Sequence, residues 1–153
     1  MHALLTRAQT ALQGGRGPEV VRLLSPAFKT ASSLPREEEL AVRCALAEAW
    51  LLQDDLDQAA SALGRTPDTL RETISPGRLS TLWRLHGRIA SARGDQSRAI
   101  AHHGRALKQA EVAHDSRLIG LAHYELGQCY RQVGDYAIVR DHITKAAAAL
   151  HAA

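Results

Sequence analysis

Two arginines, Arg84 and Arg88, stand one helical turn apart in a stretch whose composition favours a helix. Residues four apart share one side of a helix, so both guanidinium groups would point at the same region. Each guanidinium is a planar fork of donors that matches a carboxylate or a phosphate. The pair is therefore a candidate anion-binding site. The alternative is that both arginines lie on the surface and pair with nearby acidic side chains, which needs no ligand.

The eight histidines do not form a metal-binding pattern. Helical metal sites need ligands three or four residues apart on one face, and no two of these histidines have that spacing. His102 and His103 are adjacent, so they point about 100° apart around a helix. His86 and His123 are expected to contribute to packing. The sequence therefore predicts no metal site and no cofactor.

Nucleophilic catalysis has no support in the sequence either. Cys129 falls on a predicted packing face and Cys44 on a face expected to be open, and neither is followed by an oxyanion-type turn. The Gly-rich run 14–18 lacks the preceding strand and the following Lys-Ser/Thr of a phosphate-binding loop. It is better interpreted as a turn, with Pro18 in the first turn of the next helix. We therefore expect a protein that is not an enzyme.

The composition predicts an all-α protein. Hydrophobic residues make up 45% of the chain but aromatic residues only 4%, so the core must be built from Ala and Leu, which favour helices. The apolar runs are too short to cross a bilayer, the N-terminus lacks the pattern of a secretory signal, and the cysteines are few and far apart. A cytoplasmic protein is expected. The net charge of +3 comes from interspersed charges, without a block of like charges.

The chain repeats itself after forty residues. This shift superimposes the small residues Ala47, Gly87 and Gly127, and it also superimposes three turn-forming pairs, Asp54-Asp55, Gly94-Asp95 and Gly134-Asp135. A small residue in the middle of a helix indicates that a neighbouring helix approaches closely. The pairs combine a residue that ends one helix with an Asp that caps the next. Each repeat is therefore predicted to be a helix, a tight turn and an antiparallel helix.

The repeats resemble the tetratricopeptide repeat family over essentially the whole chain. The residues at the family's pattern positions in the third unit are Trp83, His86-Gly87, Ala90, Gly94-Asp95, Ala99, His103 and Ala106, and those in the fourth are Leu126-Gly127, Tyr130, Gly134-Asp135-Tyr136, Val139, Ile143 and Ala146. The sequence departs from the family pattern at His86, His103 and Val139. Forty residues also exceed the family's usual unit of about 34. Repeats of about forty residues resemble those in bacterial transcriptional regulators and signalling ATPases, where the arrays act as sensor or assembly modules.

The resemblance implies a right-handed α–α superhelix, or solenoid, of about four antiparallel helical hairpins in one domain. The units would span about 1–39, 40–79, 80–119 and 120–153. The second unit is irregular, because Gly64 and Pro67 should end its second helix early, and a short extra helical turn over Asp68 to Ile74 would fill the remainder. The chain could also be a fragment of a longer protein.

In such arrays the first helix of each unit lines a concave groove that holds a protein or peptide. From the repeat register, the expected groove residues are Glu48, Leu51, Arg84, Arg88, Tyr124, Gln128 and Arg131. The resemblance implies a binding scaffold, as a sensor or assembly module of a bacterial regulatory protein. The alternative is a freestanding adaptor in a larger complex. A third possibility, direct nucleic-acid binding, is disfavoured by the modest charge and the few aromatic residues.

The C-terminal stretch suggests self-association. Residues 146–153 are almost all Ala, whereas the terminal helix of a repeat array needs a polar outer face. We therefore expect this end either to continue into a longer array or to pack against another copy of the chain.

Overall fold

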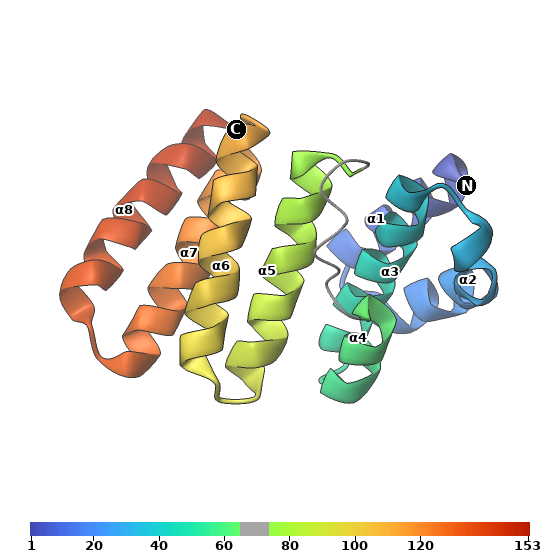
Figure 1. Ribbon diagram of the computed structural model, residues 1–153, viewed down its shortest axis with the longest axis horizontal. Helices are drawn as coiled ribbons and strands as arrows, with labels where there is room; N and C mark the ends of the chain where they lie inside the picture. Colours follow the sequence, from blue (N-terminus) through green and yellow to red (C-terminus); the bar gives the residue numbers. More distant parts are fainter. Residues whose placement is uncertain (65–73) are drawn as a thin grey trace. The chain divides into compact units, whose positions relative to one another are not determined.

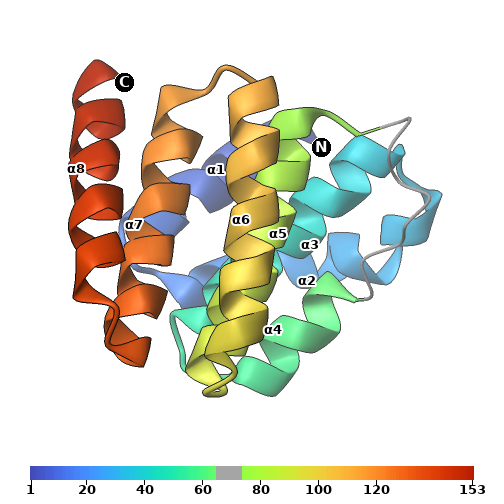
Figure 2. The same ribbon diagram turned by 60° about the vertical axis from the view of Figure 1, so that its left-hand side comes forward.

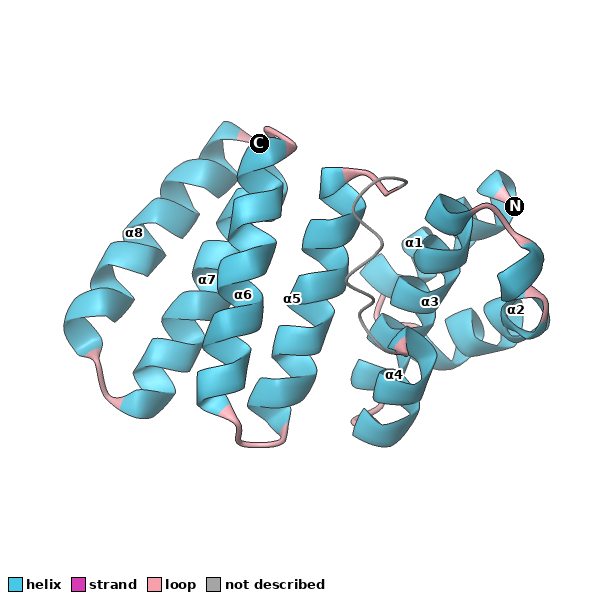
Figure 3. Ribbon diagram, in the orientation of Figure 1, coloured by secondary structure: helices cyan, strands magenta, loops and turns pink. Residues whose placement is uncertain are grey.

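The computed structural model describes residues 1–64 and 74–153, and every regular element in these ranges is helical (Figure 1 and Figure 3). The all-α prediction is confirmed for the described residues. The chain divides into two compact units, Met1–Ile74 and Ser75–Ala153. The extra helical turn predicted over 68–74 lies outside the described residues, apart from Ile74, which is not helical.

The described residues of the first unit form four α-helices: α1 (His2–Gln13), α2 (Gly17–Lys29), α3 (Arg36–Leu51) and α4 (Leu56–Leu63), with a short 3₁₀ turn at Ala31–Ser33. Helix α3 is central and packs against α1, α2 and α4. The core of the first unit is made of small and aliphatic side chains with no exposed surface, among them Ala8, Val20, Leu24, Val42 and Ala59. Helix α4 ends at Leu63 because Gly64 takes a positive φ of 69°, which confirms the predicted early end.

The second unit consists of α5 (Pro76–Ala92), α6 (Gln96–Val112), α7 (Ser116–Val133) and α8 (Tyr136–Ala152). Figure 1 and Figure 2 show consecutive helices side by side and running in opposite directions, with α8 at one edge of the unit. Helix α7 packs against α5, α6 and α8. The buried residues between α5, α6 and α7 include Ala90, Ala99 and Cys129.

The turns confirm the forty-residue register. Asp55, Asp95 and Asp135 are the N-caps of α4, α6 and α8, and each carboxylate accepts a hydrogen bond from the backbone N–H three residues later. The residue before each cap has a positive φ: 57° at Asp54, 84° at Gly94 and 82° at Gly134. The capping oxygen satisfies a backbone donor that the helix itself leaves without a partner. Each predicted hairpin turn therefore forms where the sequence places it.

A second set of caps shares this spacing, although the sequence pattern did not reveal it. Helices α3, α5 and α7 begin after Pro35, Ser75 and Asp115, which are also forty residues apart. Ser75 and Asp115 accept hydrogen bonds from the backbone at Arg78 and Leu118. The first helix of each hairpin thus starts about four residues before the unit boundaries expected at 40, 80 and 120, because the cap residue sets the start.

Close helix contacts occur at the small residues, as predicted. A Cβ on Gly87 of α5 would lie only 2.5 Å from Cε1 of His103 on α6, and a Cβ on Gly127 of α7 would lie 3.1 Å from Cδ1 of Ile143 on α8. A Cβ on Gly120 of α7 would likewise lie 2.5 Å from Cγ of Leu150 on α8. The sequence pattern did not indicate this contact. Glycine therefore allows the paired helices of each hairpin to approach.

Candidate functional site

Arg84, Arg88 and Glu125 form an ionic cluster between α5 and α7. Nη1 of Arg84 donates a hydrogen bond to Oε1 of Glu125 at 3.3 Å, and Nε of Arg88 lies 3.9 Å from the same oxygen. The side chain of Arg84 is only 10% exposed and that of Arg88 is 29% exposed. The two arginines do point at one anion, as their spacing indicated, but that anion is a carboxylate of the chain itself.

This geometry changes the role expected for Arg84. A mostly covered guanidinium that already donates to a carboxylate has few donors to offer a ligand. A buried charge left without its counter-charge is costly, so Glu125 holds Arg84 in place and Arg84 holds α5 against α7. Glu125 was not among the predicted groove residues. No local signal marks it, because it lies 41 residues from Arg84 in the sequence.

The predicted residues of α7 lie beside this cluster. Tyr124, Gln128 and Arg131 follow each other at intervals of four and three residues, so they lie along one face of α7. Tyr124 is 47% exposed, Gln128 is half-buried and Arg131 is exposed. We call Arg84, Arg88, Tyr124, Glu125, Gln128 and Arg131 the α5–α7 face. On this face the ring of Tyr124, the amide of Gln128 and the guanidinium of Arg131 are accessible to solvent.

The remaining two predicted residues lie elsewhere. Glu48 and Leu51 are half-buried on α3, in the first unit. The structure describes each unit by itself, so it does not bring Glu48 or Leu51 together with the α5–α7 face. Cys44, also on α3 and expected on an open face, is buried with 3% exposure.

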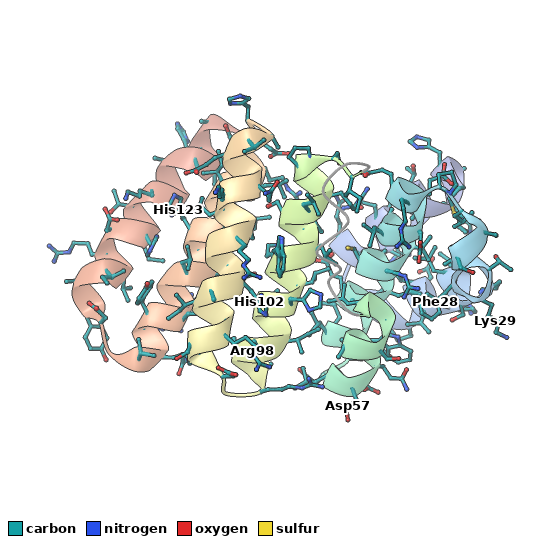
Figure 4. All side chains as sticks on the ribbon, in the orientation of Figure 1. Phe28, Lys29, Asp57, Arg98, His102 and His123 are labelled. Carbon is teal, nitrogen blue, oxygen red and sulfur yellow. The ribbon has the colours of Figure 1, made fainter. Side chains whose placement is uncertain are left out.

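The histidines form ring contacts that their spacing along the helices did not indicate. Trp83 of α5 stacks on His102 of α6, with ring centroids 5.4 Å apart, and the guanidinium carbon of Arg105 lies 4.7 Å from the centroid of the Trp83 ring. Forty residues later His123 of α7 meets His142 of α8, with centroids 5.2 Å apart and the two Nδ1 atoms 2.9 Å apart. Figure 4 marks His102 on α6 and His123 on α7. The forty-residue shift aligns Trp83 with His123 and His102 with His142, so the sequence did hold a signal for the second pair.

His103 is the most enclosed histidine. It has no exposed surface, its ring packs on Gly87, and neither ring nitrogen has a hydrogen-bond partner among the described residues. Burial, aided by the nearby charge of Arg84, lowers the pKa of His103 to about 4. Burial also lowers the pKa of His86 to about 4 and that of His123 below its ordinary value. These histidines are neutral packing groups at neutral pH.

Groups suited to metal binding or covalent catalysis do not assemble in the described part of the chain. No cluster of three or more His, Cys, Asp or Glu side chains there could hold a metal ion. Burial raises the pKa of the Cys129 thiol, which disfavours the reactive thiolate. None of the helices in these ranges is long and apolar enough to cross a lipid bilayer.

The arginines of α5 and α6, which a nucleic acid could contact, have different partners within the chain. Arg84 and Arg88 face Glu125 on α7, whereas Arg98 lies 3.5 Å from Asp95 and Arg105 stacks on Trp83. Each is already engaged with an acidic or aromatic group of the chain, which reduces the free positive charge that phosphates require.

Comparison with known proteins gives no relative from which a function can be transferred. No family model matches the chain, and a search of curated proteins finds no significant match.

Proposed function

We propose that this chain is a protein- or peptide-binding scaffold of the tetratricopeptide-repeat kind, and that the second unit binds its partner on the α5–α7 face. The observation that supports this most is the row Tyr124, Gln128 and Arg131 beside a covered ionic cluster, in which Tyr124 and Arg131 are exposed and Gln128 is half-buried. Tyr and Arg are the residue types that contribute most to protein interfaces. Helix α7 fixes the backbone beneath the row, so little backbone conformational entropy is lost on binding.

The ionic cluster supports this role indirectly. Arg88 is 29% exposed and lies at the edge of the cluster, so it can still contact an acidic group of a partner. Arg84 is mostly covered and acts as a support that keeps α5 and α7 in register. The partner that fits is an extended or helical peptide with an aromatic or aliphatic anchor near Tyr124 and an acidic residue near Arg88 and Arg131.

The biological setting is a further part of the proposal and derives from the family resemblance. The scaffold serves as a sensor or assembly module of a bacterial regulatory protein. The alternative is a freestanding adaptor in a multiprotein complex. Both use the same face, and both exclude catalysis by this chain.

The test is a selection from a random peptide display library against the full chain. The Kd of each selected peptide is then measured by fluorescence anisotropy for the wild type and four variants. Tyr124→Ala and Arg131→Glu should each weaken binding by about tenfold or more, which corresponds to about 1.4 kcal/mol. The matched controls are Tyr136→Ala on α8 and Lys108→Glu on α6, which change the same residue type or charge on other helices.

Three results would contradict the proposal: no selected peptide, peptides whose affinity ignores the two α7 variants, or equal losses in the controls. Labelled single- and double-stranded DNA and RNA serve as a parallel probe. Tight oligonucleotide binding that weakens steeply with salt would favour the nucleic-acid alternative instead.

A further inference from the structure

The contact between His123 of α7 and His142 of α8 lies where these two helices approach closely. His123 and Gly127 are four residues apart on α7, so both face α8. A Cβ on Gly127 would lie 3.6 Å from Cβ of His142, which shows how near this turn of α8 comes. Tyr130 of α7 stacks on the His142 ring from the same side, with ring centroids 5.6 Å apart. The close approach thus holds two imidazole rings against each other, one 8% exposed and the other half-buried.

The two rings meet end to end. Their Nδ1 atoms are 2.9 Å apart and their centroids are 5.2 Å apart. The second distance equals the first plus one ring radius at each end, so both centroids and both Nδ1 atoms lie nearly on one line. This is the geometry of a linear N–H···N hydrogen bond. A metal ion does not fit between these nitrogens, because it needs about 2.0 Å to each of them.

A hydrogen bond of this kind shares one proton between two nitrogens. One Nδ1 donates and the other accepts, so the two neutral rings must be opposite tautomers. One added proton can bind Nε2 of the donor ring and leave the bond intact. A second added proton has only the accepting Nδ1 to bind, and two N–H groups on two cations would then face each other at 2.9 Å. The contact therefore tolerates one added proton and not two.

The surroundings of the pair keep both rings neutral at neutral pH. Burial lowers the pKa of His123 and that of His142 below the ordinary value of a histidine. The facing ring of His142 and the cation of Lys145 lower the pKa of His123 further. The carboxylates of Glu111 on α6 and Asp141 on α8 act on His123 in the opposite direction without outweighing burial. Asp141 raises and Lys145 lowers the pKa of His142 in the same manner.

We propose that the His123–His142 contact is a pH-sensitive switch, which holds α8 against α7 at neutral pH and opens when both rings become cations. Both folded pKa values lie below the 6.5 of the free side chain, so the unfolded chain binds protons more readily. The stabilisation is therefore complete above pH 6.5 and is lost as the pH falls below it. The apolar contacts of α8 at Gly127 and Gly120 have no titratable group, so acid loosens α8 without removing them. This inference does not depend on the peptide-binding proposal.

Nitrogen-15 NMR of the imidazole rings tests the shared proton in the wild-type chain. The signals are assigned by their loss in His123→Asn and His142→Asn variants. At pH 7 the two rings should be opposite tautomers, one with its proton on Nδ1 and the other with its proton on Nε2. As the pH is lowered to 4, they should gain protons in two separate steps. The same tautomer in both rings, or a single shared step at the ordinary pKa of histidine, would overturn the proposal.

Hydrogen exchange of the α8 backbone tests the opening. The variant His142→Asn places an amide near the position of Nδ1, and an amide both donates and accepts, so its contact with His123 should survive in acid. Exchange is measured at pH 7 and pH 5 and corrected for the intrinsic rate of each amide. Protection of residues 136–152 should fall about tenfold further in the wild type than in this variant. Both proteins keep His103, so the acid effect of that residue cancels.

The matched control is His151→Asn, which makes the same change at an exposed position of α8 and should behave as the wild type. Circular dichroism checks that both variants fold, and the tautomers of the wild type decide the question if His142→Asn does not. A folded His142→Asn variant that loses as much protection in acid as the wild type would refute the switch. Equal resistance to acid in His151→Asn would also refute it, because the effect would then not belong to the His123–His142 contact.

Discussion

Gly87 on α5 and His103 on α6 are in direct contact, because a Cβ at Gly87 would lie 2.5 Å from Cε1 and 2.7 Å from both ring nitrogens of His103. The glycine makes room for an imidazole that is 0% exposed. Two properties of the second unit depend on this contact: how closely α5 and α6 pack, and which protonation state of His103 the fold accepts.

Replacement of Gly87 by Ala should destabilise the protein although Ala is the better helix former. The added methyl group overlaps the enclosed His103 ring, and such overpacking costs about 1–3 kcal/mol. Gly104→Ala is the matched control, since Gly104 lies inside α6 and a Cβ added there would meet nothing within 4 Å. That change should stabilise by about 0.5–1 kcal/mol. The free energy of unfolding of both variants is measured by urea unfolding, followed by circular dichroism. Equal effects of the two changes would contradict the close contact.

Acid should destabilise the second unit through His103. Its pKa is about 4 in the folded protein against 6.5 for the free side chain, so the unfolded chain binds a proton more readily. The stabilising effect of the neutral ring is complete above pH 6.5 and is lost as the pH falls toward 4. The loss attributable to this residue at pH 5 is about 2 kcal/mol.

The variant His103→Leu tests this pH dependence. Thermal unfolding of the variant should change less between pH 7 and pH 5 than that of the wild type, because the variant has no proton to bind at this position. His114→Asn is the control, because His114 lies in a turn outside the helices at a positive φ of 51°, which Asn tolerates. A variant with the same pH dependence as the wild type would show that His103 does not control acid stability.

Removal of Glu125 should destabilise the packing of α5 on α7. Glu125→Ala removes the ion pair that a mostly covered guanidinium, that of Arg84 at 10% exposure, makes between α5 and α7. We expect a loss of about 1–3 kcal/mol. The variant Lys145→Ala breaks an exposed ion pair, 54% and 58% exposed at its two ends, and should leave the unfolding midpoint nearly unchanged. If both variants unfold alike, the cluster has no structural role.

The capping carboxylate of Asp95 should stabilise α6 measurably. Its oxygen accepts a hydrogen bond from the backbone N–H of Arg98 at 3.0 Å. Asp95→Ala should cost about 0.5–2 kcal/mol, whereas Asp95→Asn keeps an acceptor and should cost less. Denaturant unfolding gives the free energy of unfolding of each variant, and the difference between the two reports the contribution of the hydrogen-bond acceptor. An Asn variant as unstable as the Ala variant would argue that the charge, and not the cap, matters.

The sequence by itself determined where the helices turn. Asp55, Asp95 and Asp135 cap their helices through hydrogen bonds to the backbone three residues later, and Gly94 and Gly134 take the positive φ that a tight turn needs. These interactions are local, so residue types at fixed spacing identify them. The close approach at Gly87 and Gly127 was also predictable, because a glycine inside a helix otherwise weakens it.

Only the tertiary structure decided which side chains meet across helices. Arg84 faces Glu125 rather than open solvent, and His123 meets His142, because packing fixes how far each helix is rotated and shifted against its neighbour. Spacing along one helix identifies the residues that share a face, but it does not identify what lies opposite that face. The same limit applies to Tyr136, Ile143 and Leu150 of α8, whose seven-residue spacing is visible in the sequence while their exposure is a property of the packed unit.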